Sequence, residues 1–334
     1  MLGVPEKLSL ANLPTKIEKL DRLTKFLGGP DIYIKRDDQT GSEISGNKVR
    51  KLEFAVKEAI NKNCDMLITC GGIQSNHARA TAAVAAKLGM KSILLLRGDK
   101  STPPEGNHFL DLLLGAEVRF ISPGDYSSRR MEIMEDIKKE YEAKGMKPYI
   151  IPEGASNGIG TFGYYMGMEE IIKQQKELGT EFDGIILAVG SGGTYAGLCL
   201  ASKIFNSSSK IHGINVCDNG EYFVNKIYDI LMESKKYFSC DVTISKGDIN
   251  IIDGYVGAGY AKSSKEELEF IQFIAGLEGL ILDPVYTGKA MYGMVQEIKK
   301  GRFKEYKNLL FIHTGGIYGL FPQKEMFDFG SKLD

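Results

Sequence analysis

A lysine that directly follows an asparagine is the residue best suited to covalent chemistry in this sequence. Lys48 stands where a predicted strand over residues 32–36 and a polar loop give way to a predicted helix. A lysine at a helix start lies near the positive end of the helix dipole and can be partly buried, and both effects favour its neutral amine. The neutral amine is the form that makes Schiff bases with carbonyl compounds. The alternative is a solvated lysine that opens an amphipathic helix.

A glycine-rich turn could bind an anion. The apolar run 184–189 is followed by five residues of this turn, Gly190, Ser191, Gly192, Gly193 and Thr194. Bare backbone amides and hydroxyls at the start of a helix suit a phosphate group. Tyr195 stands where a dinucleotide fingerprint requires its third glycine or alanine, which disfavours a nicotinamide-dependent dehydrogenase. A purely structural turn is the alternative.

A second turn of this kind carries polar side chains. Residues 71–77 follow another apolar run and bring Ser75 and Asn76 to the start of an alanine-rich helical segment. Ser75 could cap the helix, bind a ligand or react, and Asn76 could be an ordinary turn residue. His77 has no Asp or His at metal-ligand spacing, so no metal site is predicted.

Two tyrosines in the second half of the chain could move protons. Tyr286 and Thr287 lie between an apolar run and a predicted helix start, and Tyr260 ends the glycine-rich loop 257–260. A tyrosine hydroxyl in such a place can relay a proton, whereas a packing tyrosine with a satisfied hydroxyl is the alternative. The segment 313–316 ends the last predicted strand with His, Thr and two glycines.

The elements that must position these residues fall into two sets. Short apolar runs alternate with stretches of helical period, which is typical of parallel sheets built from β-α-β units. The predicted strands are 66–69, 92–96, 117–121 and 148–151 in one set, and 184–189, 210–216 and 309–314 in the other. The predicted helices include 78–88, 127–144, 193–205, 265–277 and 289–299. Ligands bind at the carboxyl ends of parallel strands, where these motifs fall, so we expect a cleft between two domains with a hinge near residues 154–160.

Composition narrows the class of protein and of ligand. The chain has 334 residues, with 43% hydrophobic and 25% charged residues, as in a soluble globular protein of two domains. Its net charge is -1, which gives no reason to expect nucleic acid or an anionic membrane as partner, and a small ligand is expected. The five cysteines lack the spacing of a metal site or disulfide framework. The sequence also shows no secretory signal and no apolar run of membrane-spanning length. Together with the cysteine spacing, these features predict a cytoplasmic protein.

Taken in order, the motifs resemble those of the D-cysteine desulfhydrase and 1-aminocyclopropane-1-carboxylate deaminase family over nearly the whole chain. The matching segments are 32–38, 46–48, 74–77, 190–194, 283–289 and 313–316. The resemblance implies an α/β fold of the tryptophan-synthase-β type (fold type II), with two open, twisted, mostly parallel sheet domains. It implies a large domain made of residues 1–50 and 160–334, a small domain of residues 51–159, and a homodimer.

The same resemblance implies pyridoxal 5'-phosphate as cofactor. Lys48 would be the Schiff-base lysine, and Lys51, one helical turn on, would contact the phosphate together with the loop 190–194. Asn76 would lie beside the ring oxygen of the cofactor. Thr287 would face the pyridine nitrogen.

The resemblance also implies which residues would contact the substrate, a small amino acid. Ser75 would face the substrate carboxylate and the reacting carbon, and Tyr260 and Tyr286 would flank the substrate as proton donors, acceptors or stacking groups. Lys48, once released, would remove the Cα proton.

Thr287 is the residue that separates the two branches of this family. The deaminases carry a glutamate there, which keeps the pyridine nitrogen protonated and makes the ring a strong electron sink. A threonine hydroxyl cannot hold that charge, and eliminating a thiolate needs less carbanion stabilisation than opening a cyclopropane. The sequence therefore predicts elimination of D-cysteine to pyruvate, hydrogen sulfide and ammonia. The alternatives are 1-aminocyclopropane-1-carboxylate deamination, removal of sulfite from cysteate, and a non-catalytic small-ligand-binding protein.

Overall fold

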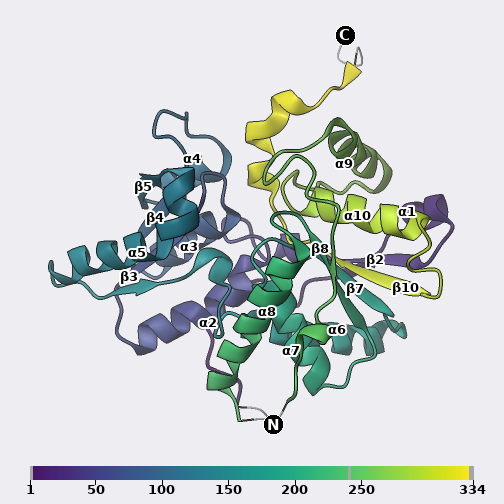
Figure 1. The fold of residues 1–334 in the computed structure, drawn as a ribbon, viewed down its shortest axis with the longest axis horizontal. Coiled ribbons are helices and arrows are strands. Elements are labelled where there is room, and N and C mark those ends of the chain that lie inside the picture. Colours follow the sequence, from purple (N-terminus) through teal and green to yellow (C-terminus); the bar gives the residue numbers. More distant parts are fainter. Residues whose placement is uncertain (1–2, 240–241, 331–334) are drawn as a thin grey trace.

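Two β-sheets form the framework of the molecule (Figure 1). The computed structural model describes residues 3–239 and 242–330. The large sheet has the strand order β1-β2-β10-β7-β8-β9, in which β1 is antiparallel to β2 and all other neighbours are parallel. Its strands are β1 (Ile17–Lys19), β2 (Asp31–Lys35), β10 (Asn308–Ile312), β7 (Gly184–Val189), β8 (Lys210–Asn215) and β9 (Ile251–Ile252).

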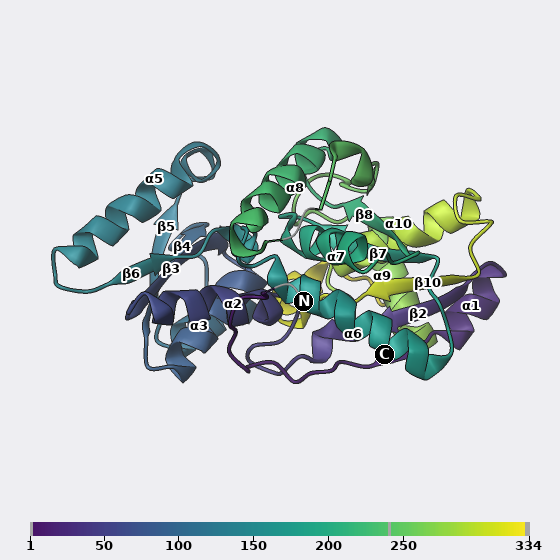
Figure 2. The same ribbon diagram turned by 90° about the horizontal axis from the view of Figure 1, so that it is seen from below.

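The small sheet is parallel throughout and has the order β5-β4-β3-β6. Its strands are β5 (Glu117–Ile121), β4 (Lys91–Arg97), β3 (Met66–Gly72) and β6 (Pro148–Ile150). The helices α3 (Asn76–Lys87), α4 (Gly106–Leu113) and α5 (Pro123–Glu142) belong to this lobe. Figure 2 shows α5 at one end of the molecule and α1, beside the large sheet, at the other.

Helices cover both faces of the large sheet. One face packs against α6 (Phe162–Leu178), α7 (Gly193–Ile204) and α8 (Gly220–Ser234), and the other against α1 (Asp21–Leu27), α9 (Lys265–Glu278) and α10 (Thr287–Lys299). Side chains of β7 alternate between the two cores, with Ile185 and Leu187 in one and Ile186 in the other. Both faces of the strand are therefore buried, which is why β7 reads as a continuous apolar run.

The helix α2 (Lys48–Asn61) lies between the two lobes, because it contacts α6 on one side and α3 on the other. Arg50, two residues after Lys48 in this helix, is buried and donates two hydrogen bonds to Asp37, at 2.9 Å each. Arg50 also pairs with Glu170 of α6, at 3.0 Å. These buried charges fix the first turn of α2 relative to the large sheet.

The structure agrees with the two predicted sets of strands. Every predicted strand is present, with ends that differ by up to three residues, whereas α1, α4, α6 and α8 were not among the predicted helices. The boundaries 50/51 and 159/160 between the two domains stay a prediction. Among the residues that the structure describes, none of the helices has the length and apolar character that a membrane crossing requires.

Candidate active site

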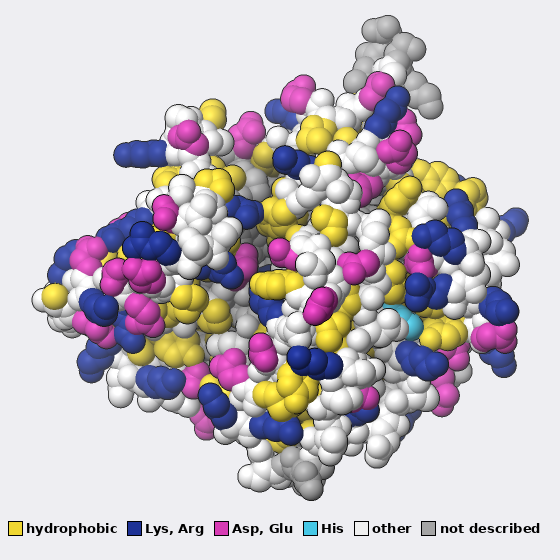
Figure 3. Space-filling view, in the orientation of Figure 1, with side chains coloured by type: hydrophobic (Ala, Val, Ile, Leu, Met, Phe, Trp, Pro, Cys, Tyr) yellow, Lys and Arg dark blue, Asp and Glu magenta, His cyan; other side chains and the backbone are white. Residues whose placement is uncertain are grey.

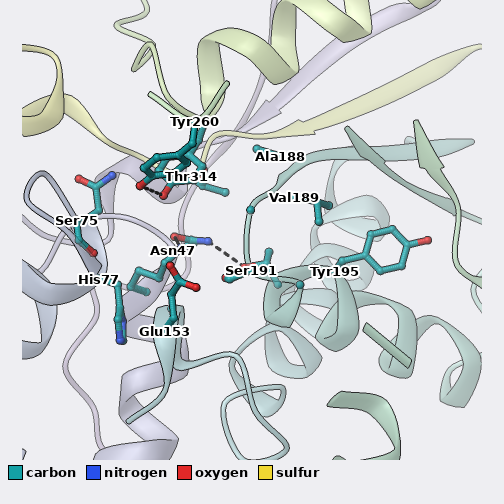
Figure 4. A pocket seen from close by; sticks show the side chains of 18 residues that line it. Asn47, Ser75, His77, Glu153, Ala188, Val189, Ser191, Tyr195, Tyr260 and Thr314 are labelled. Carbon is teal, nitrogen blue, oxygen red and sulfur yellow. Dashed lines mark hydrogen bonds between the residues drawn. The ribbon is translucent and has the colours of Figure 1, made fainter. Parts of the chain in front are cut away.

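A pocket lies between the two sheets, where the carboxyl ends of β3 and β7 meet the starts of α2, α3 and α7 (Figure 4). From the small lobe it is lined by Ser75 and Asn76, and from the large lobe by residues of the glycine-rich turn 190–194. Lys48 and the two predicted tyrosines complete the lining. The topology thus brings together motifs that lie far apart in the chain, such as those of Lys48 and Thr314, which are separated by 266 positions.

Lys48 is the first residue of α2 and its amine faces the pocket. Its Nζ donates to Asn47 Oδ1 at 3.0 Å and lies 5.9 Å from the centre of the Tyr286 ring. Burial lowers the pKa of Lys48 to about 8, although the carboxylates of Glu153 and Asp283 act in the opposite direction. A substantial fraction of the amine is therefore neutral near physiological pH, as a Schiff-base lysine requires.

Lys51 is completely buried one turn further along α2, and its amine lacks an acidic partner. Among the described residues, its amine bonds only to Ser156 Oγ, at 3.4 Å, and no carboxylate oxygen lies within 4.0 Å of Nζ. Burial, and then the positive charges of Lys48 and Lys226, hold its pKa well below the usual range. Such a group gains most from an anion, because an anion would restore its charge and bond it.

The glycine-rich turn meets Lys51 through Ser156. Ser156 Oγ accepts from the backbone N–H of Gly193 at 3.2 Å and lies 2.8 Å from Ser191 Oγ. A Cβ atom at Gly193 would lie 2.7 Å from Ser156 Oγ, so only glycine allows this approach. The start of α7, three hydroxyl or amide groups and a buried unpaired lysine together form a cradle that fits a phosphate group.

Asn47 joins the two halves of the site. Its Nδ2 donates to Thr194 Oγ1 in the glycine-rich turn at 2.9 Å, while its Oδ1 accepts from Lys48. The bond that Asn47 Nδ2 donates is drawn as a dashed line in Figure 4. The side chain before the lysine therefore sets the position of the lysine relative to the phosphate cradle. The sequence motif Gly-Asn-Lys is the signal that could have identified this role of Asn47, which was not among the predicted site residues.

Ser75 and Asn76 lie at the start of α3, on the side of the pocket that belongs to the small lobe. Ser75 Oγ accepts from the backbone N–H of Ala78 at 3.1 Å, as a helix N-cap does, and it also lines the pocket. Asn76 Oδ1 accepts from Asn107 Nδ2 at 2.9 Å. His77 is buried, bonds to Thr69 Oγ1 through Nε2 at 2.8 Å, and has a pKa held well below its usual range by burial.

Tyr260 and Tyr286 meet over the pocket. Their hydroxyl oxygens are 2.8 Å apart, and their rings are nearly perpendicular with centres 6.0 Å apart. Burial raises the pKa of Tyr260 to about 12. Burial, followed by the neighbouring Tyr260, raises the pKa of Tyr286 well above its usual range. Both phenols therefore keep their protons at neutral pH and can donate one of them to a leaving group.

Thr287 lies outside the lining of the pocket. Its hydroxyl donates to Asp283 Oδ1 at 2.7 Å and accepts from the backbone N–H of Asp283 at 2.8 Å. The Asp283 carboxylate also accepts from the backbone amides of Val285, Tyr286 and Thr287, so it caps the start of α10. Two other threonines line the pocket, Thr194 in the glycine-rich turn and Thr314, which follows β10. The contact of Thr287 with the pyridine nitrogen stays a prediction.

Two further site residues are Ser156, within the segment 154–160 that the sequence predicted to be only a hinge, and Glu153, directly before it. Glu153, in a short 3₁₀ turn (Glu153–Ala155), lines the pocket and accepts from the hydroxyl of Tyr126 at 2.7 Å. Ser156 follows and bonds Lys51 and the glycine-rich turn, as described above. The segment directly follows β6, so its place at the carboxyl end of a predicted strand was the available signal.

Comparisons with known proteins find similar sequences over nearly the whole chain. The family model described as pyridoxal-phosphate dependent enzyme matches residues 8–315. A Thermotoga maritima protein, named provisionally as a 1-aminocyclopropane-1-carboxylate deaminase, is 44% identical over 95% of this chain and 98% of its own length. The bifunctional D-cysteine desulfhydrase/1-aminocyclopropane-1-carboxylate deaminase of Arabidopsis thaliana mitochondria is 43% identical over 94% of this chain and 79% of its own length.

A solved structure supports the same conclusion about the fold. The crystal structure of an ACC deaminase homologue has 39% sequence identity to this chain and a TM-score of 0.89, over 96% of this chain and 95% of the other. The predicted fold class, two mostly parallel sheet domains of the tryptophan-synthase-β type, is confirmed, as are the suspected family and its cofactor.

Proposed function

This chain belongs to the family of pyridoxal-phosphate-dependent enzymes, and we propose that it is a lyase that converts D-cysteine and water to pyruvate, hydrogen sulfide and ammonia. The observation that carries the proposal is the placement of the Lys48 amine below a pair of protonated tyrosines, in a pocket that also holds a phosphate cradle. A base on one side and a proton donor on the other are what a β-elimination requires.

The residues that would hold pyridoxal phosphate all lie within this one site. The phosphate would bind Lys51, Ser156 and the backbone amides at the start of α7, and the carbonyl carbon would bind the Lys48 amine. Asn76 would lie beside the ring. When bound, this cofactor supplies a sink for the electron pair that remains on Cα after loss of its proton.

The other steps belong to side chains of the chain itself. The N-terminus of α3 binds the substrate carboxylate, because Ser75 and Asn76 line the pocket at the start of this helix, where the helix dipole favours an anion. The free amine of Lys48 takes the Cα proton as general base. Tyr286, supported by its hydrogen bond to Tyr260, donates a proton to the departing sulfur. Water then hydrolyses the released aminoacrylate to pyruvate and ammonia.

The surroundings of Thr287 favour D-cysteine over the cyclopropane substrate. The deaminases resemble this segment but carry a glutamate at this position, whereas Thr287 is buried and bonded to Asp283. Ring opening would therefore lack the carboxylate that keeps the pyridine nitrogen protonated. Elimination of a thiolate needs a weaker electron sink.

A second candidate function is 1-aminocyclopropane-1-carboxylate deamination. The names of the Thermotoga maritima and Arabidopsis thaliana relatives favour it, because both include this activity. The two reactions share the carboxylate site and the base, so the pocket alone supports both. Their products differ, since the cyclopropane gives 2-oxobutyrate without sulfide.

The test is a comparison of substrates on the cofactor-loaded protein. We expect pyruvate and sulfide in equal amounts from D-cysteine, and no oxo acid from 1-aminocyclopropane-1-carboxylate. Lys48→Ala should abolish both turnover and the visible absorption of the lysine-bound cofactor. Turnover of D-cysteine at the wild-type rate by Lys48→Ala would overturn the role of this residue.

A further inference from the structure

A second cavity adjoins the catalytic pocket on the side that faces solvent between the two lobes. It has a volume of about 420 Å³ and lies between β4 and α5 of the small lobe and α8 of the large lobe. Three residues line both spaces, namely Glu153, Gly190 and Tyr260. Figure 3 shows the surface hollowed between the lobe of α5 and the lobe of α8. A hydrosulfide ion is only somewhat larger than a water molecule, which occupies roughly 30 Å³ in the liquid, so the cavity far exceeds what this leaving group needs.

Three cations line this cavity and lack an acidic partner. Arg97 ends β4, Arg130 belongs to α5 and Lys226 to α8, and within the described part of the chain none of them lies within 4.0 Å of a carboxylate oxygen. Arg129, next to Arg130 but on the outer face of α5, is paired with Glu132 at 2.9 Å. Positive side chains that are left unpaired inside a cavity, while their neighbour outside is paired, indicate a site for an anion.

Aromatic rings hold the two arginines in place. The guanidinium of Arg97 lies 4.8 Å from the centre of the Tyr260 ring and 5.1 Å from that of Tyr126, and that of Arg130 lies 5.2 Å from the Tyr126 ring. Stacking leaves the N–H groups in the guanidinium plane free to bind an anion. Arg130 uses part of one edge, donating from Nη1 to the backbone oxygen of Tyr126 at 3.0 Å.

Negative groups do not cancel this charge. Of the two carboxylates that line the cavity, Glu153 already accepts from the Tyr126 hydroxyl at 2.7 Å, and Asp218 is exposed to solvent. The cavity therefore holds one more positive than negative charge, beside a ring, Tyr260, that flanks the proposed place of the leaving group.

We propose that this cavity is a leaving-group subsite, and that it extends the substrates from D-cysteine to D-cysteine S-conjugates whose S-substituent carries a carboxylate or sulfonate. This inference rests on the proposed elimination. The substituent passes Tyr260 into the cavity, and Arg97, Arg130 and Lys226 bind its negative end. The enzyme then discriminates between substrates by their leaving group, while Ser75 and Asn76 bind the amino-acid carboxylate that all substrates share.

The reaction balances as in the elimination of D-cysteine. Lys48 takes the Cα proton, the Cβ–S bond breaks, and the sulfur leaves with the electron pair of that bond and receives a proton from Tyr286. The products are a thiol that carries the carboxylate or sulfonate, and an aminoacrylate. The aminoacrylate consumes one water to give pyruvate and ammonia. No oxidant or reductant takes part.

The test compares two conjugates of equal size on the cofactor-loaded protein. S-(carboxymethyl)-D-cysteine carries the charge, and S-(carbamoylmethyl)-D-cysteine is its neutral amide. We expect kcat/KM for the charged conjugate to exceed that for the amide about tenfold or more, as one charge-assisted contact would give. Arg130→Gln and Lys226→Gln should each reduce this ratio severalfold. Arg129→Gln is the matched control and should leave the ratio unchanged.

D-cysteine serves as the reference that separates the two proposals. Turnover of D-cysteine with equal kcat/KM for the two conjugates would overturn the subsite and leave the elimination intact. If D-cysteine is not turned over, calorimetric titration of the same proteins with the two conjugates replaces the kinetic ratio. A binding preference that Arg130→Gln removes would then support the subsite alone, and equal binding would overturn it.

Discussion

Replacing Lys51 with methionine should weaken binding of pyridoxal phosphate and stabilise the protein that lacks it. Lys51 is fully buried, and its amine has one 3.4 Å contact and no acidic partner among the described residues. Without the cofactor, a buried donor so poorly bonded costs about 1–3 kcal/mol, so Lys51→Met should raise the free energy of unfolding of the apoprotein by about that amount. With the cofactor, it loses a charge-assisted hydrogen bond to phosphate, worth about 1.5–3 kcal/mol.

The loss of that bond corresponds to a rise in the dissociation constant of about 10- to 150-fold. The dissociation constant is measured by titrating apoprotein with pyridoxal phosphate and following the visible absorption, and apoprotein stability by urea denaturation. Lys57→Met is the matched control, because Lys57 lies on the same helix but is half-buried and paired with Glu6 at 3.3 Å. Unchanged cofactor affinity in Lys51→Met would refute the phosphate cradle, and a loss of stability in the apoprotein would refute the account of Lys51 as an unpaired buried cation.

Lys48, Asp37 and Tyr286 provide three further tests. The rate at which apoprotein captures the cofactor, followed by stopped-flow absorbance, should rise with pH and level off above about 8, the pKa of Lys48, because only the neutral amine reacts; a rate that still rises steeply at pH 10 would contradict this. Burial acts to raise the pKa of Asp37, but Arg50 outweighs it and lowers the pKa to about 2, so the carboxylate stabilises the fold above pH 3.8 and loses this effect as the pH falls towards 2. Asp37→Asn should therefore cost about 3–5 kcal/mol in urea denaturation at pH 7 and flatten the acid limb, whereas wild-type stability at pH 7 would contradict the buried pair. Tyr286→Phe should lower kcat for D-cysteine about a hundredfold and leave β-chloro-D-alanine much less affected, since chloride departs without a proton; equal losses with both substrates would exclude the donor role.

Much of the framework follows from local patterns in the sequence. The run 184–189 is apolar at every position because both faces of β7 are covered, and this makes it recognisable without any knowledge of its neighbours. The start of α2 at Lys48 and of α7 at Gly193 also follow from local signals, a polar loop and a glycine-rich turn. Because parallel strands place their carboxyl ends together, such signals also locate the pocket.

The parts that the sequence missed depend on contacts between distant segments. Ser156 becomes a site residue only because it meets Lys51 and Gly193, which are 105 and 37 positions away. Glu153 reaches the pocket because β6 lies at the edge of the small sheet beside β3. No periodic pattern marks either residue, since both lie in an irregular segment.

Asp283 illustrates a signal that is present in the sequence but that the sequence analysis did not use. The carboxylate of Asp283 accepts from the Thr287 hydroxyl and from three backbone amides at the start of α10, while the contact of Thr287 with the pyridine nitrogen stays a prediction. An aspartate that directly precedes proline, a few residues before a helix, commonly accepts backbone hydrogen bonds at the helix start. That pattern indicates the capping role of Asp283, and with it the direction of Thr287. The homodimer and the cytoplasmic location stay predictions.

The most direct test of the central claim is the product analysis of the cofactor-loaded protein with D-cysteine, L-cysteine, cysteate and 1-aminocyclopropane-1-carboxylate. Pyruvate and sulfide would be measured together in each reaction. The elimination proposed here predicts equal amounts of both from D-cysteine and no 2-oxobutyrate from the cyclopropane. Formation of 2-oxobutyrate without any sulfide from D-cysteine would contradict it and would identify ring opening as the reaction of this site.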